Sequence, residues 1–340
     1  MKAVIMAGGM GTRLRAVTGD TPKPMADMLG KPMMEHIVEL LKTHGFDDIC
    51  VSLRYRAGDI MAHFGDGSRF GVKMQYRVEE SALGTAGGVK NCADFFGNED
   101  FLVISGDAAC DFDLALLMAE HKNRGAAVTL ALYRHPEPLR YGLAVTDGSG
   151  LVRSFIEKPD WSRVVTDLVN TGIYAISPGI MDYVPDDVPF DFARDLFPQL
   201  MEAGELLVGL PMEGYWCDVG DPLSYYRCCA DALSGRLRLT LPDQFASVRD
   251  GNEEKPDDGD EGVACPCRSR AELMGTLSEL MLDMGADYSD GIRLSGENYS
   301  LHIAPLSRRS AIRIAVRSED TEFARELAES AKKLAEALDL

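Results

Sequence analysis

A glycine-rich loop directly after an apolar run is the feature that most constrains this chain. Val4–Ala7 is apolar and contains β-branched residues, which predicts a strand buried on both faces of a sheet. Gly8, Gly9 and Gly11 follow at once. Because glycine lacks Cβ, all three permit positive φ angles and let backbone N–H groups point inward together. A concave row of N–H groups binds anions, typically phosphate, so we expect a phosphate-binding loop here.

Two cations follow this loop along the chain. Arg13 carries a planar, permanently charged guanidinium that suits phosphate oxygens, and Lys23 stands between the stiff residues Pro22 and Pro24. A glycine-rich turn alone is common in α/β proteins, so the prediction of a polyphosphate site rests on its combination with both cations. The loop is not a Walker loop, because no Gly-Lys-Ser/Thr closes it. It is not a dinucleotide fingerprint either, since Leu14 takes the place of the third glycine.

Strand and helix patterns alternate up to about residue 235, as they do in a parallel α/β sheet. The expected strands are Val4–Ala7, Ile49–Leu53, Val72–Val78, Phe101–Ser105, Ala127–Tyr133, Leu143–Thr146, Leu151–Glu157, Val169–Ile176, Leu206–Leu210 and Tyr215–Asp218. The expected helices are Pro32–His44, Leu114–Asn123, Phe192–Ala203 and Leu223–Leu233. We therefore predict an α/β fold with a Rossmann-like, mixed, mostly parallel sheet. The hexapeptide pattern of a left-handed β-helix does not occur.

Acidic residues fall where two of the expected strands end, and ligands of open α/β sheets bind at strand ends. Asp107 follows Phe101–Ser105 in a Gly-Asp pair, and Asp218 lies in a Trp-x-Asp-x-Gly motif. Alone, Asp107 is more typical of a helix cap or a turn. Two carboxylates together with phosphate oxygens form an oxygen-rich site that suits Mg²⁺.

These motifs occur together, and in this order, in a known family. Residues 1 to about 235 resemble the sugar-1-phosphate nucleotidyltransferases, most closely the bacterial and archaeal mannose-1-phosphate guanylyltransferases that are often fused to a phosphomannomutase-like region. The resemblance rests on Gly-Gly-x-Gly-Thr-Arg-Leu with Pro-Lys-Pro, Leu-Gly-Thr-Ala-Gly-Gly, Glu-Lys-Pro, Asn-x-Gly and Trp-x-Asp-x-Gly. It implies the nucleotidyltransferase fold for this part of the chain.

The resemblance also implies a role for each motif residue. Arg13 and Lys23 would hold the triphosphate of a nucleotide, and Lys158 would hold the phosphate of a sugar 1-phosphate. Asp107 and Asp218 would bind Mg²⁺ and complete the catalytic set. The residues expected around the nucleotide are Gly8, Gly9, Gly11, Thr12, Glu80, Gly84, Thr85 and Gly87. Those expected around the sugar phosphate are Tyr141, Gly142, Glu157, Asn170 and Gly172.

The activity that the resemblance implies is Mg²⁺-dependent transfer of a nucleotidyl group from a nucleoside triphosphate to a sugar 1-phosphate, with release of pyrophosphate. It favours GTP with mannose 1-phosphate. The alternatives are dTTP or UTP with glucose 1-phosphate, and a non-catalytic sensor of sugar nucleotides. A non-catalytic sensor could lose the catalytic residues, but all four of these are present: Arg13, Lys23, Asp107 and Asp218.

The charge argues against nucleic acid as a partner and leaves a nucleotide substrate open. A formal charge of −19 argues against a nucleic-acid binder, which would show a basic face. Local cations and metal ions still attract a nucleotide into a cleft. With no signal peptide and no apolar run of membrane-spanning length, we expect a cytoplasmic protein without a membrane partner. The eight cysteines are expected as reduced thiols, and the sequence is compatible with a homo-oligomer.

Three regions are expected along the chain: a nucleotidyltransferase catalytic domain over 1–235, an acidic linker over 236–264 and a small α+β domain over 265–340. Between Asp243 and Ala264 there are eight acidic and two basic residues, which is typical of a solvated linker.

The last region is similar to the final domain of phosphomannomutases. Pro305–Ser310 stands where those enzymes have a phosphate-binding loop, but it lacks the glycine. The serine-nucleophile loop of a mutase is also missing, so we expect no mutase activity. Arg308 and Arg309 favour an accessory phosphate-binding role, and an assembly surface is the alternative.

Overall fold

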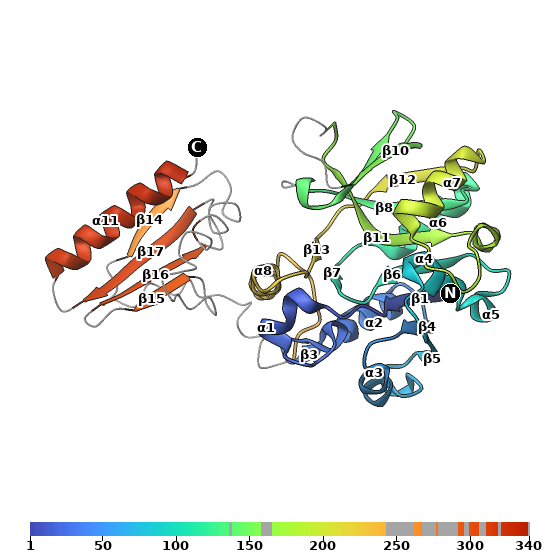
Figure 1. Cartoon of the computed structure of the whole chain (residues 1–340), viewed down its shortest axis with the longest axis horizontal. Helices are drawn as coiled ribbons and strands as arrows, with labels where there is room; N and C mark the ends of the chain where they lie inside the picture. The colour runs from blue at the N-terminus through green and yellow to red at the C-terminus, as the bar shows by residue number, and fades with distance from the viewer. Residues whose placement is uncertain are drawn as a thin grey trace. The chain divides into compact units, whose positions relative to one another are not determined.

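The computed structural model describes residues 1–135, 138–157, 165–242, 262–266, 277, 292–295, 299–305, 311–318 and 321–338 of the 340-residue chain. The chain divides into two compact units, Met1–Ala246 and Ser247–Leu340. Figure 1 draws the first from blue to yellow and the second in orange and red. None of the helices that the structure describes is both long and apolar enough to cross a bilayer. The described cysteines are free thiols.

A nine-stranded mixed sheet forms the centre of the larger unit. β1 (Lys2–Ala7) pairs in parallel with β4 (Asp48–Leu53) on one side and with β6 (Phe101–Ser105) on the other. β5 (Lys73–Val78) continues this parallel part beyond β4. Because parallel strands end at the same edge of a sheet, the loops that follow these four strands gather at one edge.

β11 (Leu168–Ile176) joins this parallel part to an antiparallel part. It runs antiparallel to β6, to β8 (Val128–Arg134) and to β9 (Gly142–Thr146). β10 (Val152–Glu157) is antiparallel to β9, and β12 (Leu207–Pro211) is parallel to β8. The predicted mixed α/β sheet is therefore confirmed, with its parallel pairs gathered around β1 and between β8 and β12.

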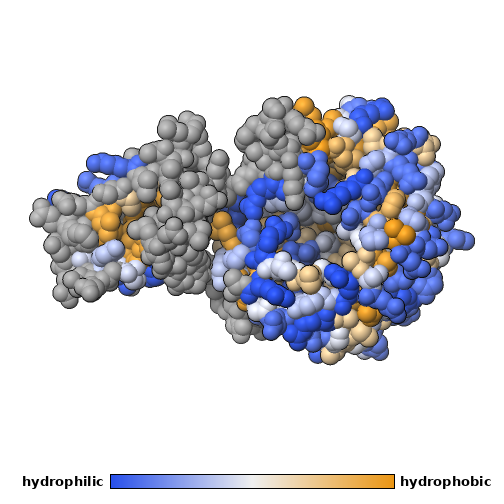
Figure 2. All heavy atoms as spheres, viewed as in Figure 1, coloured by the Kyte–Doolittle hydropathy of each residue, from blue (hydrophilic) through white to orange (hydrophobic). Residues whose placement is uncertain are grey.

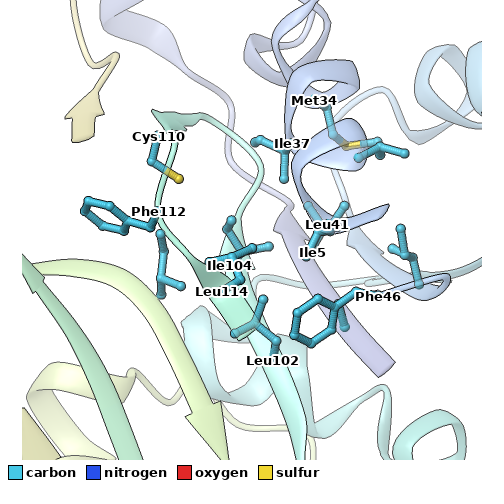
Figure 3. Close-up of a cluster of buried hydrophobic side chains, with 14 of the residues drawn as sticks. Ile5, Met34, Ile37, Leu41, Phe46, Leu102, Ile104, Cys110, Phe112 and Leu114 are labelled. Carbon is cyan, nitrogen blue, oxygen red and sulfur yellow. The ribbon is translucent and has the colours of Figure 1, made fainter. Parts of the chain in front are cut away.

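Helices cover both faces of this sheet (Figure 1). Ile5 and Val4 of β1 are fully buried in two different cores, which confirms a strand that is buried on both faces. In Figure 3, Met34, Ile37 and Leu41 lie in the same cluster as Ile5. The visible face of the larger unit in Figure 2 is mainly hydrophilic. The helices are α1 (Arg15–Thr18), α2 (Met33–Thr43), α3 (Ala57–Phe64), α4 (Gly84–Lys90), α5 (Ala93–Phe96), α6 (Leu114–Arg124), α7 (Phe197–Glu202) and α8 (Pro222–Leu233).

One predicted helix differs from the expected form. The segment Phe192–Ala203 begins as a π-helix over Phe192–Leu196 and continues as α7. Pro198 lies in the first turn of α7, and because proline has no N–H to donate, a regular α-helix does not run through it. Single turns of 3₁₀-helix occur at η1 (Thr12–Leu14), η2 (Lys23–Met25), η3 (Ser68–Phe70) and η4 (Pro138–Arg140), and a longer one at η6 (Pro178–Tyr183).

A short ribbon of two strands lies outside the main sheet. β7 (Ala108–Cys110) pairs antiparallel with β13 (Trp216–Asp218), and Asp218 lies opposite Ala108. β7 starts one residue after Asp107, so the ribbon brings the two predicted metal ligands to the same end. A second two-stranded pair, β2 (Asp27–Met28) with β3 (Lys31–Pro32), precedes α2.

The larger unit extends beyond the predicted boundary at residue 235. Leu237 is fully buried, and its N–H donates to the carbonyl of Asp231 at 3.0 Å. The ammonium of Lys31 donates to the carbonyl of Thr240 at 2.9 Å. The first residues of the predicted linker therefore pack on the larger unit. The last three residues of that linker, 262–264, begin a strand. Residues 243–261 lie outside the described part.

The smaller unit is a four-stranded antiparallel sheet with the order β14-β17-β16-β15 and a closing helix, α11 (Thr321–Leu338). α11 covers one face of the sheet (Figure 1). The helix packs small alanines onto alternate strand residues such as Ile303, Ile312 and Ile314, so the predicted small α+β unit is confirmed. Its strands are β14 (Gly262–Pro266), β15 (Ile292–Ser295), β16 (Tyr299–Pro305) and β17 (Ala311–Ser318). Arg308 and Arg309 lie outside the described residues.

Candidate active site

The glycines of the loop after β1 differ in whether the fold requires a glycine at that position. All three glycines permit a positive φ, and of the three only Gly11 adopts one, 58°. A Cβ at Gly11 would also lie 2.6 Å from Cβ of Lys23. A Cβ at Gly9 would have no neighbour within 4 Å, so the protein itself does not need a glycine there. The space over Gly9 is open to a ligand.

Lys23 is the centre of the site's charge. It begins η2 directly after Pro22, whose extended backbone cannot continue a helix backward. Its ammonium donates to Oδ2 of Asp107 at 2.8 Å and to Oδ1 of Asp218 at 3.4 Å. Lys23 is only 6% exposed. The structure thus brings together three predicted catalytic residues from three distant segments.

These contacts set the protonation of the cluster. Burial alone lowers the pKa of Lys23, but the neighbouring carboxylates of Asp107 and Asp218 outweigh it and raise that pKa. Burial likewise raises the pKa of Asp107, and Lys23 together with the hydroxyl of Ser105 reverses this and holds the pKa low. Ser105 donates to Oδ1 of Asp107 at 2.5 Å. The lysine is therefore a cation and Asp107 an anion at neutral pH.

Arg13 flanks the same carboxylate pair. The position that a Cβ would take at Gly220 lies 3.3 Å from Nη2 of Arg13 and 3.3 Å from Oδ2 of Asp218. Glycine at this position of the Trp-x-Asp-x-Gly motif lets the guanidinium approach the carboxylate. Arg13 is exposed and forms no ion pair with any residue in the described part of the chain, so its guanidinium remains available to a phosphate. Thr12 beside it is also exposed, in η1.

The two carboxylates fit a Mg²⁺ site. They converge on one point, because both contact the same ammonium nitrogen. Their side chains stay 34% and 40% exposed. The residues that the structure describes contain no cluster of three or more carboxylate, histidine or cysteine ligands. Mg²⁺ usually takes one or two carboxylates and completes its shell with water and substrate phosphates, so a pair is sufficient.

The second glycine loop is shaped by close packing against residues 188–191. Gly84 has a φ of 72°, and a Cβ there would lie 2.6 Å from the carbonyl oxygen of Phe190. A Cβ at Gly87 would lie 3.2 Å from the carbonyl oxygen of Val188. Thr85 donates from its N–H and its hydroxyl to Oδ1 of Asp191, at 3.1 and 3.0 Å. Packing explains these three residues, and their contact with a nucleotide stays a prediction.

Glu79, rather than Glu80, faces the two glycine loops. Its carboxylate accepts from the hydroxyl of Ser52 at 2.7 Å and from the N–H of Leu83 at 3.2 Å. A Cβ at Gly8 would lie 3.4 Å from its Oε1. Glu80 is exposed. The sequence analysis missed Glu79, although its place directly after β5, at the carboxyl end of a parallel strand, is a signal that could have found it.

The sugar-side residues come together through strand register. Glu157 of β10 lies opposite Gly142 of β9, and a Cβ at Gly142 would lie 2.8 Å from Oε2 of Glu157. Asn170 accepts from the N–H of Gly172 at 3.3 Å. Gly172 has a φ of 76°, and its Cβ position is 3.8 Å from Cβ of Ser105. Since Ser105 binds Asp107, Gly172 connects the sugar side to the carboxylates.

Tyr141 makes a second connection between the residues of the predicted sugar site and the carboxylates. Its ring packs edge to face on Trp216, with centroids 5.3 Å apart, and lies 4.7 Å from the ring of His135. Trp216 stands two residues before Asp218. The buried N–H of Trp216 has no acceptor among the described residues. Lys158, the predicted ligand of the sugar phosphate, lies outside the described residues.

Residues 2–235 match the family model described as nucleotidyl transferase. The chain is 38% identical over 251 residues to the UTP–glucose-1-phosphate uridylyltransferase of Synechocystis sp. (strain ATCC 27184 / PCC 6803 / Kazusa), which covers 70% of this chain and 65% of that protein. It is 35% identical over 234 residues to the mannose-1-phosphate guanylyltransferase of Mycobacterium tuberculosis, with 68% and 65% covered. The chain thus spans slightly less than two thirds of either relative.

A solved structure extends the match to the fold. A putative glucose-1-phosphate thymidylyltransferase from Bacillus anthracis, in complex with sucrose, superposes with a TM-score of 0.64 at 29% sequence identity, covering 72% of this chain and 99% of that one. The matched part includes the sheet, both glycine loops and the carboxylate ribbon. The chain therefore belongs to the nucleotidyl transferase family.

Proposed function

We propose that this chain transfers a nucleotidyl group from a nucleoside triphosphate to a sugar 1-phosphate. The observation that carries the proposal is the meeting of Lys23, Asp107 and Asp218 where the parallel strands end. Arg13 and the glycine loop after β1 lie beside them. Cations next to carboxylates that could bind a metal ion support this proposal, because a reaction between phosphate groups requires charge neutralisation.

The reaction needs one bond to form and one to break. An oxygen of the sugar phosphate attacks the α-phosphorus of the nucleotide, and the bond from that phosphorus to the bridging oxygen of the β-phosphate breaks. Pyrophosphate leaves in line with the incoming oxygen. Because the attacking oxygen is already an anion, no general base is required, and catalysis consists of positioning and charge neutralisation. We assign Arg13 and Lys23 to the triphosphate, and Lys158 to the phosphate of the sugar.

Asp107 and Asp218 would hold Mg²⁺, which supplies charge neutralisation at phosphate oxygens when it is bound. The support for this assignment is their convergence on one cation, the ammonium of Lys23. Lys23 also keeps the two carboxylates close together, since without a cation they would repel each other. The hydrogen bond from Ser105 fixes the orientation of Asp107.

On the sugar side, we propose that Glu157 accepts hydrogen bonds from sugar hydroxyl groups and that Asn170 contacts the sugar. Gly142 leaves room for a ring next to Glu157, because any side chain there would displace the carboxylate. The unpartnered N–H of Trp216, next to Tyr141, offers one further donor. A buried donor without an acceptor is costly, so a ligand or water acceptor at this point would be stabilising.

For the substrate pair we propose GTP with mannose 1-phosphate. The order of the motifs and the residues within them support it. So does the similarity to the Mycobacterium tuberculosis protein, whose name gives that activity. The alternative is UTP with glucose 1-phosphate, which the name of the Synechocystis relative supports at 38% identity.

The test is pyrophosphate release by the full-length protein with Mg²⁺. GTP, UTP, dTTP and ATP are each combined with mannose 1-phosphate and glucose 1-phosphate, with Asp107→Asn as the inactive control. We expect the fastest release from GTP with mannose 1-phosphate, and none from a nucleotide alone. Fastest release with another pair would replace the substrates and keep the reaction. Tight binding of a sugar nucleotide without turnover of any pair would favour the sensor.

A further inference from the structure

The carboxyl group of Asp111 accepts three hydrogen bonds beside the ribbon, and nothing in the reaction uses it. Its Oδ1 accepts from the N–H of Tyr215 at 2.7 Å, and its Oδ2 accepts from the N–H and the Nε of Arg238, both at 3.0 Å. The Asp111 side chain is 5% exposed and that of Arg238 is 72% exposed. Gly214 has a φ of 117°, and a Cβ there would collide with the Asp111 carboxylate. The backbone is thus shaped around this one group.

These contacts close one end of the ribbon that carries the metal ligands at its other end. Asp111 follows β7 directly, and Tyr215 directly precedes β13. The N–H of Asp111 also donates to the carbonyl of Tyr215, at 3.1 Å. At the opposite end of the same pairing, Asp218 lies opposite Ala108, one residue from Asp107.

The ribbon needs such a brace. β7 and β13 are each three residues long and, among the strands that the structure describes, pair only with each other. A pair of strands of this size is marginally stable alone. A shift of one strand past the other would move Asp218 relative to Asp107 by about one residue rise, roughly 3.3 Å. That displacement exceeds the tolerance of a metal site.

The brace comes from the segment after α8. Two of its arginines, Arg236 and Arg238, are each connected to Tyr215 through an aspartate. Arg236 forms an ion pair with Asp231, which is buried, and Asp231 accepts from the hydroxyl of Tyr215 at 2.7 Å. Arg238 reaches Tyr215 through Asp111. Arg236 and Arg238 are therefore both connected to Tyr215, the residue before β13, one through Asp231 and the other through Asp111.

We propose that Asp111 and Arg238 are positioning residues for the carboxylate pair Asp107 and Asp218, and that residues 236–240 belong to the catalytic unit as a strap across the ribbon. This inference rests on the proposed function, because it assumes that Asp107 and Asp218 hold Mg²⁺. Neither Asp111 nor Arg238 is assigned a contact with substrate or metal.

The experiment uses the full-length protein with the variants Arg238→Ala, Arg238→Lys and Asp111→Asn. Arg153→Ala is the matched control, because it also removes an arginine from an ion pair, with Asp147, and Arg153 belongs to β10 of the main sheet rather than to the ribbon. Three quantities are measured: the Mg²⁺ concentration for half-maximal rate, the affinity for Mn²⁺ by electron paramagnetic resonance in the presence of GTP, and the melting temperature.

We expect Arg238→Ala and Asp111→Asn to weaken Mg²⁺ and Mn²⁺ affinity about tenfold, as changes in groups that orient metal ligands do. Arg238→Lys should recover part of the loss, and Arg153→Ala should match the wild type. A brace that serves only folding would lower the melting temperature and leave metal affinity unchanged below it, and that result overturns the inference. A wild-type protein without Mg²⁺-dependent transfer would instead overturn the proposed function.

Discussion

The two halves of the candidate site are built in different ways. In the nucleotide half, charged groups contact one another directly, as Lys23 does with Asp107 and Asp218. In the sugar half, strand register places single polar groups, as the pairing of Glu157 with Gly142 shows. The nucleotide half consists of Arg13, Lys23, Asp107 and Asp218, and the sugar half of Tyr141, Gly142, Glu157, Asn170 and Gly172.

Because of this difference, we expect changes in the two halves to affect different kinetic constants. A cluster of opposed charges is suited to neutralising the charge that shifts during phosphoryl chemistry, so its loss should lower kcat. Groups that hydrogen-bond a substrate hydroxyl hold the ground state and the transition state alike, so their loss should mainly raise KM. Each prediction below tests one part of this contrast.

The largest effect is expected at Lys23. Lys23→Ala removes the cation between two carboxylates, and losing one such electrostatic contact costs roughly 10²- to 10³-fold in kcat. Lys23→Arg, which keeps the charge on a larger head group, should lose less. Steady-state pyrophosphate release measures both. Turnover of Lys23→Ala close to that of the wild type would remove Lys23 from the nucleotide half.

The next effect is expected at Glu157. Glu157→Gln keeps the shape of the side chain and weakens a hydrogen bond that a carboxylate accepts, which should raise KM for the sugar 1-phosphate about tenfold. The kcat value should change little. Gly142→Ala should act in the same direction, because its Cβ would press on Oε2 of Glu157. A fall in kcat with unchanged KM would erase the contrast between the halves.

A smaller effect should decide which glutamate supports the glycine loops. Glu79→Gln weakens two hydrogen bonds, from Ser52 and Leu83, and should lower the stability of the larger unit by about 1–2 kcal/mol. Glu80→Gln changes an exposed side chain and should stay within about 0.5 kcal/mol of the wild type. Thermal unfolding measures both. A raised KM for the nucleotide in Glu80→Gln alone would instead support the predicted contact of Glu80 with the nucleotide.

The smallest effect is expected from removing the second unit. A fragment of residues 1–246 keeps both halves of the site and the strap, so its activity should stay within a few-fold of the full chain. A fragment ending at residue 235 lacks Leu237, which is fully buried, and Arg238, so it should melt at a lower temperature and bind Mg²⁺ more weakly. An inactive but folded 1–246 fragment would show that residues beyond the larger unit take part in the reaction.

Local patterns in the sequence were sufficient for most of the sheet. β6 has the predicted bounds, Phe101–Ser105, and β1 is buried on both faces, because runs of apolar residues between turn signals follow directly from burial. The charge cluster was predicted as a set of residues, since each lies in a short motif. Its contacts were not, because Lys23 and Asp218 are brought together only by the fold.

The misses have a common physical reason. β5 ends at Val78, as predicted. Whether Glu79 or Glu80 faces the loops depends on the direction in which each side chain leaves the backbone after that end, and the strand pattern does not fix this direction. The brace between Asp111 and Arg238 joins residues from distant segments, and no local motif surrounds either one. The predicted boundary at residue 235 follows the end of the strand and helix pattern, but the larger unit continues past it and fully buries the side chain of Leu237.

The central claim is that the nucleotidyl group passes to the sugar phosphate in a single step. The stereochemical course at the α-phosphorus tests this claim most directly. The substrate is a nucleoside 5′-O-(1-thiotriphosphate) of one configuration, and the configuration of the sugar-nucleotide product is read by ³¹P nuclear magnetic resonance. A single in-line attack by the sugar phosphate, held between the halves, predicts inversion. Retention would mean two successive displacements through a nucleotidyl-enzyme intermediate, and it would contradict an account in which positioning and charge neutralisation alone carry the reaction.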